Sequence, residues 1–193
     1  MFDNLKGKNI ILASKSPRRR ELLKELGLDF EIISIDGVEE KYPENLETKK
    51  IAEFLSNLKA DAYLSVLNKN DLIITADTIV VCDNKVLGKP NDYDCAINML
   101  MSLSGKTHEV ITGVTILTAE KRTSFSVSTD VVFANITREE AEYYVDKYSP
   151  FDKAGAYGIQ EWIGYVAVKS INGSFYNVMG LPLHRLYQEL KSF

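Results

Sequence analysis

The sequence predicts an α/β fold, because apolar runs typical of strands alternate with segments of helical periodicity. The first indication is a strand at 9–13, followed by a tight loop and a helix that begins at Pro17. The second is the run 71–76, which is almost continuously apolar, as in a strand buried on both faces. The third is a pair of long alternating segments, 107–118 and 123–134, which predict an antiparallel hairpin.

Composition and charge limit the classes of function. The chain has 193 residues, of which 45% are hydrophobic, so we expect one domain over residues 1–193. Its 23 basic and 27 acidic residues argue against a protein held on nucleic acid by a basic surface. No stretch approaches the roughly 20 apolar residues of a membrane span, and the N-terminus lacks a signal-peptide apolar region. Cys82 and Cys95 lack partners at ligand spacing, so we expect a cytoplasmic protein with reduced thiols.

The elements before residue 70 follow from periodicity and from turn residues. The first helix carries leucines on one face and is expected to stop at Gly27. The run 30–35 predicts a second strand, which leads into an acidic loop at 36–41. Between Glu47 and Val66, apolar residues recur mostly at three- and four-residue spacing, which predicts a long amphipathic helix.

In the middle of the chain, the strand at 71–76 is expected to end by delivering Asp77 and Thr78. A short hairpin of 79–82 with 85–87 should follow, joined by Asp83 and Asn84. Asn91 or Asp92 can cap the next helix, which should end near Gly105.

The last third combines helices with a loop. Thr137 and Glu140 fit a capping box at the start of a helix. The segment 151–160 is rich in small residues, and we interpret it as a binding loop. A strand at 165–169, a loop at 172–174 and a final helix at 181–191 are expected to complete the fold.

The first loop and helix predict an anion site. Ser16 is a good N-cap and Pro17 suits the first helical position, so backbone amides should point into the loop. Arg18, Arg19 and Arg20 follow, although the helix dipole disfavours cations in a first turn by about 0.3–1 kcal/mol each. We interpret them as ligands of an anion such as phosphate. The alternative is that they are good helix formers that point into solvent.

Short segments spread over the whole chain carry a family resemblance. They are 13–19, 76–78, 88–90, 104–105, 112–114, 153–160 and 180–182. In order and spacing they resemble the Maf family of nucleoside triphosphate pyrophosphatases, over about residues 9 to 190. The resemblance implies a central mixed, twisted sheet flanked by helices, with two lobes around a cleft, as in Maf proteins and inosine triphosphate pyrophosphatases.

The resemblance also implies an activity. A nucleoside triphosphate would be cleaved between its α and β phosphates, with a divalent metal cation, Mg²⁺ or Mn²⁺, as cofactor. No nucleic acid or membrane partner is expected, whereas a homodimer is. The implied roles are removal of surplus or non-standard nucleotides and a link to arrest of cell division.

Charged residues of this chain match the family's site. Asp77 matches the proposed proton acceptor, and Glu40 matches a glutamate that would hold the metal ion together with Asp77. Lysines that surround the triphosphate are matched by Lys59, Lys89 and Lys153, and Ser14, Arg18 and Arg19 would bind phosphate as well. Alternatives remain open: Asp77 as a cap of the following turn, the acidic pair as a solvated turn, and Glu39 in place of Glu40.

Four positions bear on substrate preference. The family branch that acts on dTTP and UTP has the residues found here at Arg18, Thr78 and Gln160. The methylated-GTP branch tends to have Trp, Gln and Glu there and lacks a lysine at the place of Lys153. An amide and a hydroxyl can match the hydrogen-bonding edge of a pyrimidine, whereas a cationic purine favours an aromatic face and a carboxylate. One departure is Glu161-Trp162-Ile163, where the family has small, glycine-rich residues.

Two other functions remain as alternatives. One is a pyrophosphatase for modified purine triphosphates such as 7-methyl-GTP. The other is a non-catalytic nucleotide-binding regulator of septum formation, which would need the cations but not both Glu40 and Asp77.

Overall fold

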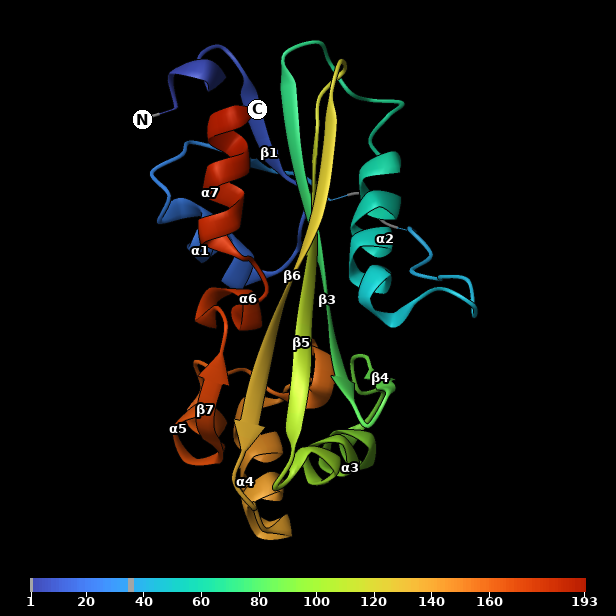
Figure 1. Cartoon of the computed structure of the whole chain (residues 1–193), viewed down its shortest axis with the longest axis vertical. Coiled ribbons are helices and arrows are strands. Elements are labelled where there is room, and N and C mark those ends of the chain that lie inside the picture. The colour runs from blue at the N-terminus through green and yellow to red at the C-terminus, as the bar shows by residue number, and fades with distance from the viewer. Residues whose placement is uncertain (1, 35–36) are drawn as a thin grey trace. The chain divides into compact units, whose positions relative to one another are not determined.

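The computed structural model, which describes residues 2–34 and 37–193, contains a mixed sheet of seven strands (Figure 1). The strand order is β2-β1-β3-β5-β6-β7, and β4 pairs with β3. β1 runs parallel to β2 and β3, whereas β4 is antiparallel to β3 and β7 is antiparallel to β6. The strands are β1 (Asn9–Leu12), β2 (Glu31–Ile32), β3 (Asp71–Cys82), β4 (Lys85–Leu87), β5 (Thr107–Leu117), β6 (Arg122–Phe133) and β7 (Val168–Asn172).

Helices connect these strands and confirm the α/β class. They are α1 (Pro17–Lys24), α2 (Thr48–Asp61), α3 (Tyr93–Leu103), α4 (Arg138–Tyr148), α5 (Trp162–Ala167), α6 (Phe175–Met179) and α7 (Leu183–Ser192). Two 3₁₀ turns lie at Asp3–Leu5 and Ala154–Ala156. In the described ranges, no helix is long and apolar enough to cross a membrane.

The chain forms two compact units. Unit 1 comprises Met1–Asp77, Thr112–Val127 and Gly180–Phe193, and unit 2 comprises Thr78–Ile111 and Ser128–Met179. Asp77 is therefore the last residue of a segment of unit 1, and Thr78 is the first residue of a segment of unit 2. That these units make one functional domain stays a prediction.

Unit 1 is built by packing α2 against the sheet. Ser56 of α2 bonds the Thr115 hydroxyl of β5 at 2.9 Å, and its carbonyl accepts from the Thr75 hydroxyl of β3 at 2.7 Å. A Cβ at Gly113 of β5 would lie 2.2 Å from the carbonyl carbon of Ala52, so only glycine permits this close approach. The N-terminal and C-terminal segments also meet in this unit, because the side-chain amide of Asn4 donates to the Leu190 carbonyl at 2.7 Å (Figure 1).

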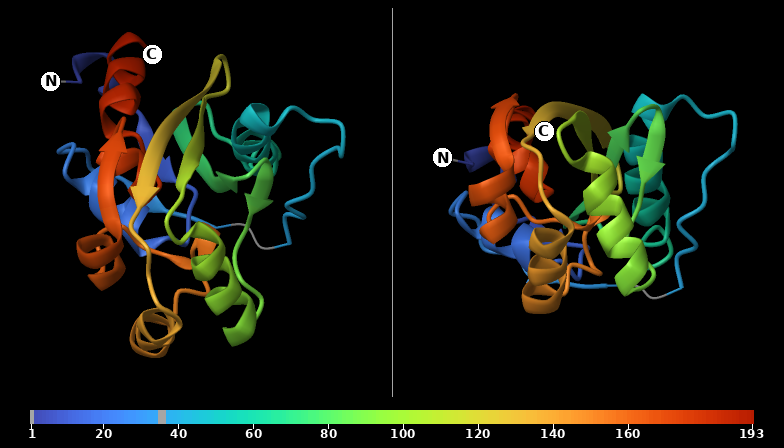
Figure 2. Two further views of the ribbon diagram at one scale, coloured as in Figure 1. Left: turned by 60° about the horizontal axis from the view of Figure 1, so that its bottom comes forward. Right: turned by 90° about the horizontal axis from the view of Figure 1, so that it is seen from below.

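Unit 2 has its own apolar core. α3 packs against α4, and Figure 2 shows these two helices next to each other below the sheet strands. Leu100, Phe133 and Tyr144 are almost completely buried there. Tyr157 and His108 join this core, with ring centroids 5.0 Å and 4.9 Å from that of Phe133.

Turns and helix caps follow the sequence closely. The side chain of Asp92 accepts from the Cys95 amide at 2.7 Å, and the capping box of Thr137 and Glu140 has both of its bonds. The turn between β3 and β4 places Asp83 and Asn84 at positive φ, as a two-residue hairpin requires. These predictions are confirmed.

Two predicted elements are too long. α2 ends at Asp61 rather than near Val66, because the chain tightens into turns that bury Tyr63 and leave Leu64 and Val66 exposed. Of the strand expected at 30–35, only β2 forms. It is exposed and pairs with the short β1, which offers few partners. Ile35 and Asp36 lie outside the described residues.

Two predictions misplace a boundary. β3 does not end at Asp77 but continues to Cys82, because it pairs with β1 up to Ile74 and with β4 from Val80 onwards. The strand expected at 165–169 begins only at Val168, after α5. The burial of Ile163 and Ala167, four residues apart, favours that helix.

Candidate active site

The loop between β1 and α1 is fixed by its serines. Ser16 is the N-cap of α1, and its hydroxyl accepts from the Arg19 amide at 3.4 Å. The Ser16 amide in turn donates to the Ser14 hydroxyl at 3.2 Å. Pro17 occupies the first helical position. The loop is thus prearranged, and the Ser14 hydroxyl still has a proton to donate to an anion.

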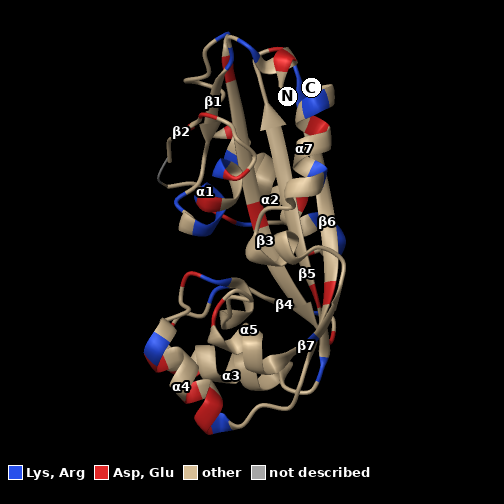
Figure 3. Cartoon of the chain, turned by 90° about the vertical axis from the view of Figure 1, so that its left-hand side faces the viewer, with Lys and Arg blue, Asp and Glu red and all other residues tan. Residues whose placement is uncertain are grey.

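Arg19 connects α1 to two distant segments of unit 1. Its Nε donates to the Gly180 carbonyl at 2.8 Å, and one terminal nitrogen donates to the Ala76 carbonyl at 2.9 Å. Burial lowers the pKa of the guanidinium, Asp77 and Glu40 raise it, and Arg18 lowers it. Arg19 therefore lies among the acidic residues of this unit and is not a solvent-exposed side chain. Figure 3 shows the basic start of α1 in blue.

Lys59 of α2 contacts two carboxylates. Its ammonium pairs with Asp77 of β3 and lies 3.0 Å from Glu40 of the acidic loop. The side chains of Lys59 and Asp77 are only 18% and 10% exposed. Asp77 is therefore not an exposed turn cap, whereas Glu40 is 44% exposed and reaches Lys59 from the acidic loop. Glu39 instead pairs with the exposed Lys41.

The carboxylates of Asp77 and Glu40 suit a divalent metal ion. Because one ammonium contacts both, they face the same small space. Carboxylate oxygens are the ligands that Mg²⁺ prefers, and it is often bound by one or two of them together with substrate phosphates and water. Within residues 2–34 and 37–193, no three His, Cys, Asp or Glu residues form a metal-binding group. The donor set thus fits an ion whose shell a substrate completes.

Unit 2 brings Lys89 and Lys153 into neighbouring segments. The Gly155 amide of the loop at 151–160 donates to the Gly88 carbonyl at 3.0 Å, which ties this loop to the residue before Lys89. Lys89 is exposed, whereas the side chain of Lys153 is only 8% exposed. Lys153 pairs with Asp152 at 2.8 Å and with Glu161 at 3.3 Å.

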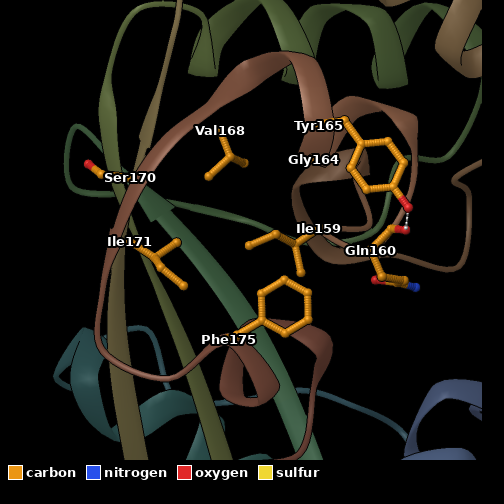
Figure 4. Close-up of a pocket in the computed structure, with 8 residues that line it drawn as sticks. All are labelled: Ile159, Gln160, Gly164, Tyr165, Val168, Ser170, Ile171 and Phe175. Atoms are coloured by element: carbon orange, nitrogen blue, oxygen red, sulfur yellow. Dashed lines mark hydrogen bonds between the residues drawn. The ribbon is translucent and has the colours of Figure 1, made fainter.

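Gln160 lies at one end of an apolar pocket of unit 2 with a volume of about 300 Å³ (Figure 4). Ile159, Val168 and Ile171 contribute aliphatic side chains to this pocket. Tyr165 fixes the backbone at this point, since its hydroxyl donates to the Gln160 carbonyl at 3.1 Å. The side-chain oxygen of Gln160 is buried, and in the described part of the chain it has no hydrogen-bond partner.

The predicted site residues thus fall into two groups. In unit 1 the structure brings Arg19, Glu40, Lys59 and Asp77 together, and Ser14 and Arg18 belong to the loop and helix that carry Arg19. Thr78, Lys89, Lys153 and Gln160 belong to unit 2. That both groups serve one cleft stays a prediction.

Sequence reasoning assigned no role to Glu161, which contacts Lys153, or to Tyr144, which contacts Glu161. Glu161 pairs with Lys153, and the Tyr144 hydroxyl donates to Glu161. The signal for Glu161 was its charge at a position where the family has small residues. Tyr144 gave no signal, because a buried tyrosine at helical spacing fits a core position equally well.

The fold is α/β, and the acidic and basic cluster of Arg19, Glu40, Lys59 and Asp77 in unit 1 is of the kind that binds phosphate esters. The family model described as Maf-like protein matches residues 9–193. The chain belongs to the Maf family.

Two relatives agree with this assignment, and a solved structure shares the fold. A dTTP/UTP pyrophosphatase of Bacteroides thetaiotaomicron is 56% identical over 191 residues, which cover 99% of each chain. One of Porphyromonas gingivalis is 50% identical over 195 residues, which cover 100% of this chain and 98% of that one. The Ham1 protein of Staphylococcus aureus has the same fold, with a TM-score of 0.52 and 19% identity over 94% of this chain and 100% of that one.

Proposed function

We propose that this protein hydrolyses dTTP and UTP to the nucleoside monophosphate and pyrophosphate. The observation that carries the proposal is the contact of Lys59 with both Asp77 and Glu40. A binder of triphosphates needs cations, but it has no use for two carboxylates on one lysine. The names of the relatives from B. thetaiotaomicron and P. gingivalis, which are dTTP/UTP pyrophosphatases, support the same activity.

In the proposed reaction, a water oxygen attacks the α-phosphorus and the bond from that phosphorus to the bridging oxygen of the β-phosphate breaks. The electron pair of that bond leaves with pyrophosphate, and the proton of the water passes to the Asp77 carboxylate. The burial of Asp77 supports this role, because a buried carboxylate is shielded from bulk water. Lys59 orients the carboxylate through its ion pair.

Glu40 and Asp77 are the residues that would hold Mg²⁺ or Mn²⁺. When bound, the metal ion would offset the negative charge of the phosphates. The remaining charge of the triphosphate falls to cationic side chains, which we propose to be those of Arg18, Arg19, Lys89 and Lys153. The Ser14 hydroxyl adds a neutral donor.

The preference for a pyrimidine is proposed to lie with Thr78 and Gln160, together with Arg18. The buried oxygen of the Gln160 side chain supports this, because an N–H of a pyrimidine base could donate to it. The Thr78 hydroxyl could complete the recognition of the base edge. We further propose a homodimer and a role in removing surplus or non-standard nucleotides from the cytoplasm.

The test is to measure pyrophosphate release from dTTP, UTP, 7-methyl-GTP and other triphosphates with Mg²⁺ or Mn²⁺, and to identify the monophosphate. The proposal expects release from dTTP and UTP, little from 7-methyl-GTP, and none after chelation of the metal ion. Release from 7-methyl-GTP alone would keep the reaction and refute the proposed specificity. Binding of triphosphates without any release would favour the regulator instead.

A further inference from the structure

Glu161 occupies the centre of a small polar network in unit 2. One carboxylate oxygen lies 3.3 Å from the Lys153 ammonium, and the other accepts a hydrogen bond from the Tyr144 hydroxyl. Tyr144 is fully buried, and the side chains of Glu161 and Lys153 are 19% and 8% exposed. These contacts place a negative charge beside a lysine that is itself almost enclosed.

The carboxylate of Glu161 is held from several directions. The hydroxyl oxygen of Tyr144 accepts from the Gly158 amide at 2.9 Å, so the same tyrosine fixes the loop that precedes Glu161. A Cβ at Gly158 would lie 2.9 Å from the carboxyl carbon of Glu161, so the carboxylate packs directly on this glycine. The Glu161 carbonyl also accepts from the Gly164 amide at 2.9 Å. Its position is therefore set by the fold.

Lys153 has a second carboxylate neighbour that is much more exposed to solvent. Asp152 lies 2.8 Å away, but its side chain is 54% exposed and belongs to the adjacent residue. Solvent screens the charge of an exposed carboxylate, so this ion pair contributes less than one with a carboxylate that is largely buried. Glu161 is thus the better candidate for orienting the lysine.

A carboxylate near a phosphate-binding lysine is electrostatically unfavourable for a triphosphate. It is useful only if it improves the placement of the ammonium, whose long stem is otherwise flexible. We propose that Glu161, anchored by Tyr144, is a positioning residue that holds the Lys153 ammonium where it meets the phosphates of the substrate. This inference rests on the proposed function, since it takes Lys153 as a phosphate ligand.

The experiment compares Glu161→Gln with the wild type. The amide keeps the size of the side chain and can still accept from Tyr144, but it loses the ion pair. Binding of α,β-methylene-dTTP, which cannot be cleaved between those phosphates, is measured by calorimetry, and KM and kcat are measured with dTTP. Misplacement of Lys153 should weaken binding and raise KM by about tenfold. Loss of a negative charge alone would do the opposite and tighten binding.

Two further variants complete the test. Asp152→Asn removes a carboxylate from the same lysine and is the matched control, for which binding should change less than threefold, roughly the scale of an exposed ion pair. In the background of Lys153→Met, Glu161→Gln should no longer weaken binding, because Glu161 acts through Lys153. Thermal unfolding of each variant verifies that it is folded.

The outcomes separate the inference from the function on which it rests. Unchanged or tighter binding by the Glu161→Gln variant, or a weakening of binding that persists without Lys153, would overturn the positioning role. A wild-type protein that binds the analogue but cleaves no triphosphate would refute the proposed activity, and the binding comparison would still decide the role of Glu161. A wild-type protein that does not bind the analogue would overturn both.

Discussion

At the residue scale, Asp77 lies at a point of β3 where neither β1 nor β4 pairs with the strand. β3 pairs with β1 as far as Ile74 and with β4 from Val80, so Asp77 lies between the two pairings. In that interval, Arg19 binds the Ala76 carbonyl and Lys59 binds the Asp77 carboxylate. Side chains from α1 and α2 thus take the place of a partner strand here, and the Asp77 carboxylate is largely buried beside cationic groups.

Replacing this carboxylate by an amide tests its role. Asp77→Asn should lower kcat for dTTP by about 10³-fold, because the proton acceptor is lost, while the affinity for α,β-methylene-dTTP at saturating Mg²⁺ stays similar. The matched control is Asp71→Asn on the same strand. Asp71 is also buried, but it accepts bonds from Asn9 and Asn68 and should affect stability rather than kcat. A variant at Asp77 with wild-type turnover would refute the role of proton acceptor.

His108 is a second residue whose surroundings determine its chemistry. It is 2% exposed, and its Nε2 lies 2.8 Å from the Tyr157 hydroxyl. Burial lowers the pKa of His108 from 6.5 to about 4. The histidine is therefore neutral at pH 7 and belongs to the core.

This burial predicts an acid sensitivity of the fold. Between pH 6.5 and about 4 the unfolded chain protonates His108 and the folded chain does not, so stability falls as the pH is lowered through this range. The contribution amounts to about 3 kcal/mol of unfolding free energy in total. Denaturant unfolding at pH 7 and pH 4.5 should show a smaller loss for His108→Gln than for the wild type. The exposed His184→Gln should retain the wild-type loss, and equal losses in all three proteins would contradict the prediction.

At the element scale, sequence patterns predicted the elements that local physics determines. The caps at Ser16, Asp92 and Thr137 form as expected, since a cap depends on a few neighbouring residues. The extent of β3 and the end of α2 were wrong, because tertiary pairing and packing decide them. α6 and the turn of α5 were missed because five or six residues carry too little periodicity.

The start of α1 offers a paired test of the anion site. Arg18 is half-buried and Arg20 is exposed, although both lie in the first turn and carry the same charge. Arg18→Ala should weaken binding of α,β-methylene-dTTP by about tenfold, the value of one charge-assisted hydrogen bond. Arg20→Ala should leave binding nearly unchanged in the same calorimetric titration. Equal effects of the two substitutions would mean that only the net charge of the helix matters.

At the scale of the whole molecule, the contacts that join distant segments lay beyond sequence reasoning. Arg19 reaches the Gly180 carbonyl across 161 positions, and the segment 180–182 had been recognised only as a motif without a role. Likewise, the family resemblance gave Lys59 a role apart from that of Glu40 and Asp77. The structure shows that Lys59 contacts both carboxylates. From its position in the sequence alone, Lys59 could not have been distinguished from an ordinary surface lysine.

In the proposed reaction, water attacks the α-phosphorus of a pyrimidine triphosphate. The most direct measurement is hydrolysis of dTTP by the wild-type protein in ¹⁸O-labelled water, with mass spectrometry of both products. We expect the label to enter dTMP and the pyrophosphate to be unlabelled. Label in pyrophosphate, or formation of dTDP and phosphate, would contradict it.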